Sequence, residues 1–101
     1  MKACKALIIA LGASLVWANY GLAGDMQKGR QVYDLHCIAC HGAGGISSDP
    51  LVPSFADGDL LYLMDSDLLR RIRDGKDTMP AFRGLLRDDE IRDVITYLRS
   101  F

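Results

Sequence analysis

The five-residue segment at positions 37–41, Cys-Ile-Ala-Cys-His, constrains this chain more than any other feature. Residues three apart on a helical turn point to the same side, so the thiols of Cys37 and Cys40 can each bond to one flat molecule. The imidazole of His41 then lies beside the same molecule. Cys-x-x-Cys-His is the sequence that attaches haem through two thioethers, with the histidine binding the iron. The segment therefore predicts one covalent haem c held by Cys37, Cys40 and His41.

Two close cysteines can also bind zinc, act as a redox dithiol or form a disulfide, and each of these roles fits less well. A structural zinc site needs four ligands, and the second histidine of the chain, His36, directly precedes the motif. A thioredoxin-like dithiol lies beside a βαβ unit, and no pattern of that kind is visible. A plain disulfide would leave the adjacent histidine without a role. Haem attachment accounts for all three side chains.

The N-terminal segment has the layout of a secretory signal peptide. Lys2 and Lys5 are followed by an uncharged, mostly apolar stretch at 6–18, and small residues follow it. A membrane anchor is the alternative, but this stretch falls short of the roughly 20 apolar residues that cross a bilayer. Cleavage after Ala18 or after Ala23 would fit, and the second site is preferred.

This choice divides the chain into a signal peptide at 1–23 and one compact domain at 24–101, expected in the periplasm. Removal of the signal takes Cys4 away and changes the formal net charge from −1 to −3. Nucleic-acid binding requires a basic surface, so we expect this acidic domain not to bind nucleic acid. A domain this small gains little stability from its protein core alone, which favours a bound cofactor at its centre.

The remaining sequence predicts an all-α fold, because no run of alternating β-branched residues indicates a strand. The first helix should begin near Asp25 and lead into the haem motif. The pattern then predicts a loop at 42–53, a short helical piece at 59–64, a helix ending at Gly75 and a loop at 76–85. Ser66 and Asp67 are the expected caps of the helix that ends at Gly75.

The last helix is indicated most clearly, by apolar residues at the spacing of one helix face and by acids in its first turn. We expect it to cross the first helix, with Gly29 allowing a close approach of the two backbones. The apolar residues of its face are Ile91, Val94, Ile95 and Leu98. The residues expected at the crossing are Gly29, Tyr33, Val94, Tyr97 and Leu98.

Three methionines follow the signal, and one is the best candidate for the second iron ligand. Met26 lies in the first helix, on the same side of the chain as the thiols, and Met64 is explained by core packing. Met79 lies in a loop before Pro80, far enough along the chain to reach the other face of the ring. Thioether sulfur is a soft ligand that suits haem iron.

The mature chain resembles the class I cytochromes c over essentially its whole length. The resemblance implies three to five helices around one haem, with the N- and C-terminal helices crossed, and it supports Met79 as iron ligand. It also implies that a proline carbonyl accepts the Nδ1 hydrogen of His41, from Pro53 rather than Pro50. Related chains often have Ser or Thr at the position that Arg87 occupies here, so the usual side-chain cap of the last helix is absent. Asp88 is expected to cap this helix instead. The matching blocks are 29–33, 37–42, 53–55, 75–82 and 90–99.

With both axial positions filled, the iron has no open site for a reaction, so we expect a one-electron carrier that is not an enzyme. It should be a monomer that meets redox protein partners. The alternatives are a dedicated donor or assembly accessory for one periplasmic enzyme, such as a nitrite reductase, and a haem sensor or peroxidase with an open iron site. A basic cluster is either a solvated surface or a docking patch. It comprises Arg70, Arg71, Arg73 and Lys76.

Overall fold

The computed structural model describes residues 24–101, and the signal peptide expected at 1–23 lies outside the described residues. The described part is helical, with two isolated bridges and no strand, as expected for an all-α fold. No helix in residues 24–101 has the length and apolar character needed to span a membrane. The elements in chain order are α1 (Met26–His36), α2 (Ile38–His41), the short 3₁₀ turns η1 (Ala43–Gly45) and η2 (Phe55–Asp57), α3 (Asp65–Asp74) and α4 (Asp88–Leu98).

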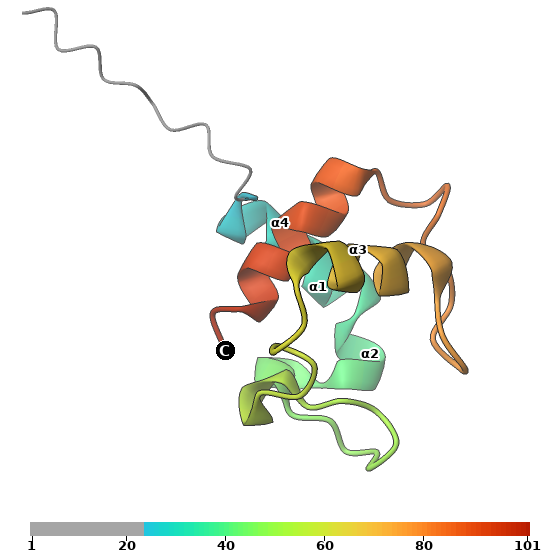
Figure 1. Cartoon of the computed structure of the whole chain (residues 1–101). Helices are drawn as coiled ribbons and strands as arrows, with labels where there is room; N and C mark the ends of the chain where they lie inside the picture. Colours follow the sequence, from blue (N-terminus) through green and yellow to red (C-terminus); the bar gives the residue numbers. More distant parts are fainter. Residues whose placement is uncertain (1–23) are drawn as a thin grey trace, which may run out of the picture.

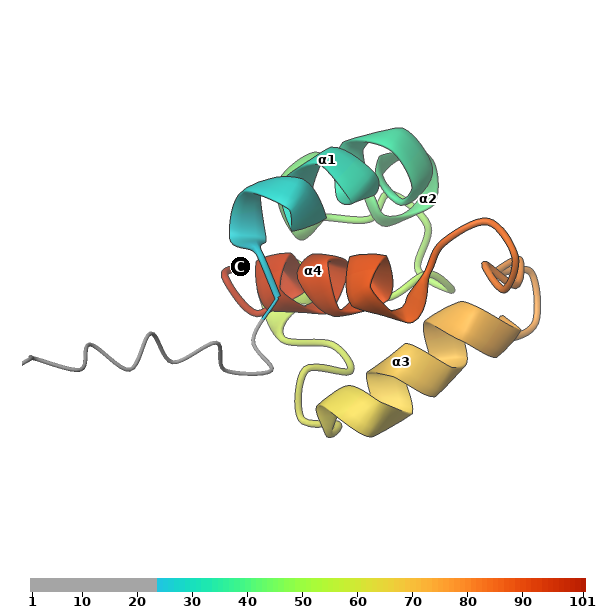
Figure 2. The ribbon, with the colours of Figure 1, turned by 90° about the horizontal axis from the view of Figure 1, so that it is seen from above.

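Helix α4 is the central element of the fold, with α1 against one side and α3 against the other (Figures 1 and 2). Its predicted apolar face is confirmed, because all four residues of that face are buried. This face carries the core because its spacing keeps the four side chains on one side of the helix. The buried residues of α4 are Ile91, Val94, Ile95 and Leu98.

The predicted crossing of the first and last helices is confirmed at Gly29. A Cβ atom on Gly29 would lie 1.9 Å from the backbone oxygen of Asp93, so only glycine allows this approach. Next to the crossing, the rings of Tyr33 and Tyr97 pack edge to face with centroids 5.4 Å apart. The contact fixes α1 on α4 and therefore fixes where the haem motif begins.

The starts of the helices show which capping predictions were wrong. Helix α3 begins at Asp65 after Met64, and no side chain caps it, so Ser66 and Asp67 lie inside the first turn. The carboxylates of Asp65 and Asp67 still favour this end, because they lie near the positive end of the helix dipole.

Helix α4 begins after Arg87, and the expected cap at Asp88 is also wrong. The backbone N–H of Arg87 donates to the carboxylate of Glu90 at 3.0 Å. This is the half of a capping box that needs no serine or threonine, so arginine can occupy the position.

The short helical piece expected at 59–64 is wrong as well, because the chain forms successive turns there and Leu60 has a φ of 64°. The guanidinium of Arg99 holds these turns from the far end of α4. It donates to the backbone oxygens of Leu61 and Leu63, each at 2.8 Å, and to Asp65 at 2.8 Å. Carbonyls that a helix would have used internally are thus satisfied by one distant side chain.

Candidate haem site

The attachment segment forms a tight helical turn directly after α1. The backbone N–H of His41 donates to the oxygen of Cys37 at 2.9 Å, which closes α2. Gly42 ends the turn with a φ of 86°, and a Cβ atom there would lie 1.7 Å from the backbone oxygen of Ile46. The turn leaves Cys37 half-buried, Cys40 exposed and His41 buried. The imidazole is therefore directed inward while both thiols remain close to it.

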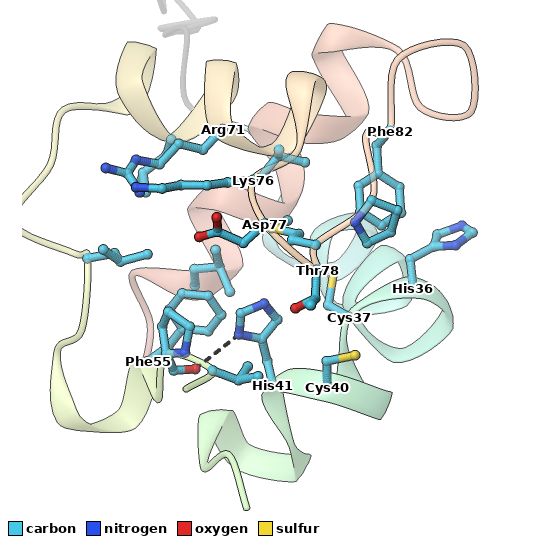
Figure 3. Close-up of a pocket in the computed structure, with 18 of the residues that line it drawn as sticks. His36, Cys37, Cys40, His41, Phe55, Arg71, Lys76, Asp77, Thr78 and Phe82 are labelled. Atoms are coloured by element: carbon cyan, nitrogen blue, oxygen red, sulfur yellow. Dashed lines mark hydrogen bonds between the residues drawn. The ribbon is translucent and has the colours of Figure 1, made fainter. Parts of the chain in front are cut away.

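One ring nitrogen of His41 is engaged by the backbone. Its Nδ1 lies 3.0 Å from the carbonyl oxygen of Pro53. The dashed line at His41 in Figure 3 marks this hydrogen bond. A carbonyl can only accept, so Nδ1 is the donor of this bond and Nε2 is the ring nitrogen left to bind iron. The ring also stacks on Phe55, with centroids 4.6 Å apart. The preference for Pro53 over Pro50 is confirmed, and the contact fixes the orientation of the His41 ring.

Tyr33 adds a support that the sequence did not indicate. Its hydroxyl donates to the backbone oxygen of Gly42 at 2.6 Å, which ties α1 to the turn after His41. The side chain is buried, and this burial raises the pKa of Tyr33 to about 12. Burial also raises the pKa of the free Cys37 thiol to about 11, with a smaller contribution from Cys40.

Met79 is presented by a tight turn that follows α3. The backbones of Lys76 and Met79 bond in both directions, at 3.1 and 2.9 Å. Gly75 precedes the turn with a φ of 74°, and a Cβ atom there would lie 2.7 Å from the oxygen of Met79. Asp77 within the turn has a φ of 53°, which asparagine and aspartate tolerate better than most residues. The thioether of Met79 is half-buried and lines the same cavity as His41.

The other two methionines of residues 24–101 do not reach this cavity. Met26 is 51 % exposed on α1, and Met64 is 69 % exposed before α3. The expectation that core packing explains Met64 is therefore wrong. Of the three, only Met79 lines the cavity that contains His41.

The cavity has a volume of about 350 Å³, within the range of small-molecule and cofactor pockets. Most of its walls are apolar, as a porphyrin ring requires. His36 lies at its rim, exposed, with its ring edge-on to Phe82. The ligating side chains and the apolar walls of the cavity together fit a haem c. Side chains of the site include Cys37, Cys40, His41, Val52, Pro53, Phe55, Leu60, Leu68, Arg71, Ile72, Lys76, Met79 and Phe82.

Comparisons with known proteins agree with this geometry. A family model described as cytochrome C oxidase, cbb3-type, subunit III matches residues 24–98. Cytochrome c6 of Thermostichus vulcanus is 35 % identical over 96 residues, which cover 92 % of this chain and 83 % of that protein. This chain is a class I cytochrome c. Cytochrome c6 of Thermosynechococcus vestitus is equally similar, at 35 % over the same share of each chain.

A solved structure also resembles this cytochrome. Cytochrome c6 of the diatom Phaeodactylum tricornutum superposes with a TM-score of 0.62 at 33 % identity, over 76 % of this chain and 93 % of that one. The class I fold expected from the sequence is thereby confirmed. The cytochrome carries one covalently bound haem c, and it is an electron-transfer protein rather than an enzyme.

Proposed function

We propose that this cytochrome is an exported one-electron carrier whose haem is attached at Cys37 and Cys40 and whose iron is bound by His41 and Met79. The observation that carries the proposal is that all four side chains line one cavity. The haem supplies an iron that alternates between the ferric and ferrous states. The protein's part is to hold the ring, exclude water from it and fix both axial positions.

The two proposed axial ligands come from different elements, which suits ligation from two sides. His41 belongs to α2, whereas Met79 belongs to the turn after α3. The bond from Nδ1 to the oxygen of Pro53 keeps the imidazole oriented and strengthens its donation through Nε2. Thioether ligation favours the ferrous state and so raises the reduction potential. We expect a positive midpoint potential.

Two ligands from the protein leave no open position on the iron, which separates this proposal from a haem sensor or peroxidase. With His41 and Met79 filling both positions, the haem would supply electron exchange without a bond to a partner. The electrons enter and leave through redox protein partners, which a monomeric carrier meets by diffusion.

The signal peptide at 1–23 and the periplasmic location belong to the same proposal. The basic start and the apolar stretch at 6–18 support export, and the family match begins at residue 24. Export also brings the two cysteines to the compartment in which haem c is attached. Mass spectrometry of the secreted protein would give its first residue, and a start other than Gly24 would move the proposed cleavage site.

Optical spectra of the haem-loaded protein test the iron ligands. The oxidised protein should show the sulfur-to-iron band at the red end of the spectrum, and the haem should stay with the protein in acid acetone. Met79→Ala should lose this band and bind carbon monoxide when reduced. Met64→Ala is the matched control, because its side chain is exposed, and it should keep the band. A band that persists in Met79→Ala would reject Met79 as ligand.

A further inference from the structure

The basic cluster at the end of α3 is divided by the fold into two pairs with different surroundings. Arg70 forms an ion pair with Asp67, with nitrogen and oxygen 3.1 Å apart. Arg73 reaches Asp88 at the start of α4, at 3.2 Å. Half of the positive charge of the cluster is thus neutralised within the molecule. The four cations therefore do not form one uniform positive surface.

The other two cations, Arg71 and Lys76, line the haem cavity. Figure 3 shows their side chains extending next to each other, away from the side where Cys37 and Cys40 lie. Arg71 is half-buried and Lys76 is exposed. Within residues 24–101, no carboxylate lies within 4.0 Å of either cation. Asp77 is the acidic side chain that lines the cavity with them.

The chemical groups of haem c indicate what such cations can bind. The ring has thioethers along one edge and two carboxylates on the side away from them. Thioethers at the two cysteines would place those carboxylates on the side of the cavity where Arg71 and Lys76 lie. A carboxylate left without a partner against apolar walls is costly, and a guanidinium matches its two oxygens with parallel hydrogen bonds.

We propose that Arg71, assisted by Lys76, binds the haem carboxylates and raises the reduction potential of this cytochrome. The inference rests on the proposed function, since it takes the thioethers to be at the two cysteines. Ferric haem carries one more positive charge than ferrous haem, so a cation beside the ring favours the reduced state. Asp77 acts in the opposite direction and moderates the effect. Arg71 touches the cofactor at its carboxylates and makes no bond to the iron.

Redox titrations of haem-loaded variants test the proposal. Arg71→Gln should lower the midpoint potential, and Arg71→Lys should restore most of the loss because it keeps the charge. Arg70→Gln removes the same charge one position away, where the side chain is exposed and paired with Asp67, so its shift should be much smaller. Lys76→Gln should act in the same direction as Arg71→Gln but more weakly, since water screens an exposed ammonium.

A resonance Raman spectrum distinguishes direct binding by Arg71 from a merely structural role, which would leave the vibrations of the haem carboxylates unchanged. The bending band of the haem carboxylates should shift in Arg71→Gln and stay in place in Arg70→Gln. Equal midpoint shifts in these two variants, or an unmoved band in Arg71→Gln, would overturn the proposal. The sulfur-to-iron band and the acid-acetone test report on the proposed function separately, so its failure would be recognised in the unmutated protein.

Discussion

Arg99, just after the last helix, forms a bond of 2.8 Å from its Nε to the carboxylate of Asp65 at the first residue of α3. The same guanidinium donates to the oxygens of Leu61 and Leu63. Three acceptors from one segment thus converge on a side chain 34 positions further along the chain than Asp65. The relationship explains how turns without regular helix remain in one conformation beneath α3.

Replacing Arg99 should therefore loosen this segment. Arg99→Ala leaves two carbonyls without their donor and should lower the free energy of unfolding by about 1–2 kcal/mol. Arg99→Lys keeps the positive charge but lacks the planar set of N–H donors of the guanidinium. It should therefore recover only part of the lost free energy of unfolding. Chemical denaturation of the haem-loaded protein measures both. Arg92→Ala, an exposed position on α4, is the control and should change stability by less than about 0.5 kcal/mol; equal losses would contradict the role of Arg99.

The crossing of α1 and α4 should not tolerate a methyl group at Gly29. Gly29→Ala gains helix propensity of about 1 kcal/mol, but its Cβ meets the oxygen of Asp93 at 1.9 Å and must push the helices apart. We expect a net loss of about 1–3 kcal/mol in the free energy of unfolding. Gln27→Ala, at an exposed position of α1, should be neutral or stabilising. A stable Gly29→Ala protein would show that the crossing is looser than described.

The glycine after His41 offers a test with a closely matched control. Gly42 and Gly44 both have positive φ, of 86° and 65°, but a Cβ atom at Gly42 would strike Ile46 whereas at Gly44 it would meet nothing within 4 Å. Gly44→Ala should cost only the backbone strain, about 1–2 kcal/mol. Gly42→Ala should cost more and reduce the yield of haem-loaded protein. Similar yields and denaturation midpoints for the two variants would count against a cramped turn.

Tyr33 should give the protein a stability component that disappears in strong alkali. The folded state raises the pKa of Tyr33 from 10.0 to about 12, so it favours the neutral phenol. This stabilisation is fully present below pH 10 and is lost as the pH rises from 10 to about 12. Tyr33→Phe should be less stable than the unmutated protein by about 1 kcal/mol at pH 7, because it lacks the bond to Gly42. The difference should shrink above pH 10.

Denaturation curves at several pH values, recorded on haem-loaded proteins, measure that change. Tyr62→Phe is the control, because Tyr62 is 80 % exposed, and it should match the unmutated protein at every pH. The difference in stability between Tyr33→Phe and the unmutated protein could instead stay constant from pH 7 to strong alkali. That result would contradict the raised pKa of a buried Tyr33.

The sequence predicted the parts of this molecule that depend on residues close together in the chain. The spacing of Cys37, Cys40 and His41, the apolar face of α4 and the small residue at Gly29 each express a local pattern. The resemblance to class I cytochromes c then indicated Pro53, a contact that spacing alone left open.

The errors lie where distant residues decide the conformation. The turns at 59–64 depend on Arg99, which no local pattern connects to them. Met64 was assigned to the core because its neighbours are apolar, yet the turns leave it exposed. The division of the basic cluster is local only in part: the pairing of Arg70 with Asp67 follows helix spacing, whereas the pairing of Arg73 with Asp88 joins two helices and is visible only in three dimensions.

The two proposed iron ligands, His41 and Met79, are held near the haem by different kinds of link. His41 is the covalent neighbour of Cys40, so the imidazole stays beside a thioether-bound ring even in an unfolded chain. Met79 is placed by non-covalent contacts alone: the two backbone hydrogen bonds of its turn, the bonds from Phe82 and Arg83 to α3, and packing against the core. With the ligands and thioethers proposed above, thermal or chemical stress should release the sulfur of Met79 before the nitrogen of His41, and the haem should stay attached to the chain. Recovery from loss of the sulfur alone would need only the return of the turn at 76–79, because the proposed thioethers keep the haem beside His41.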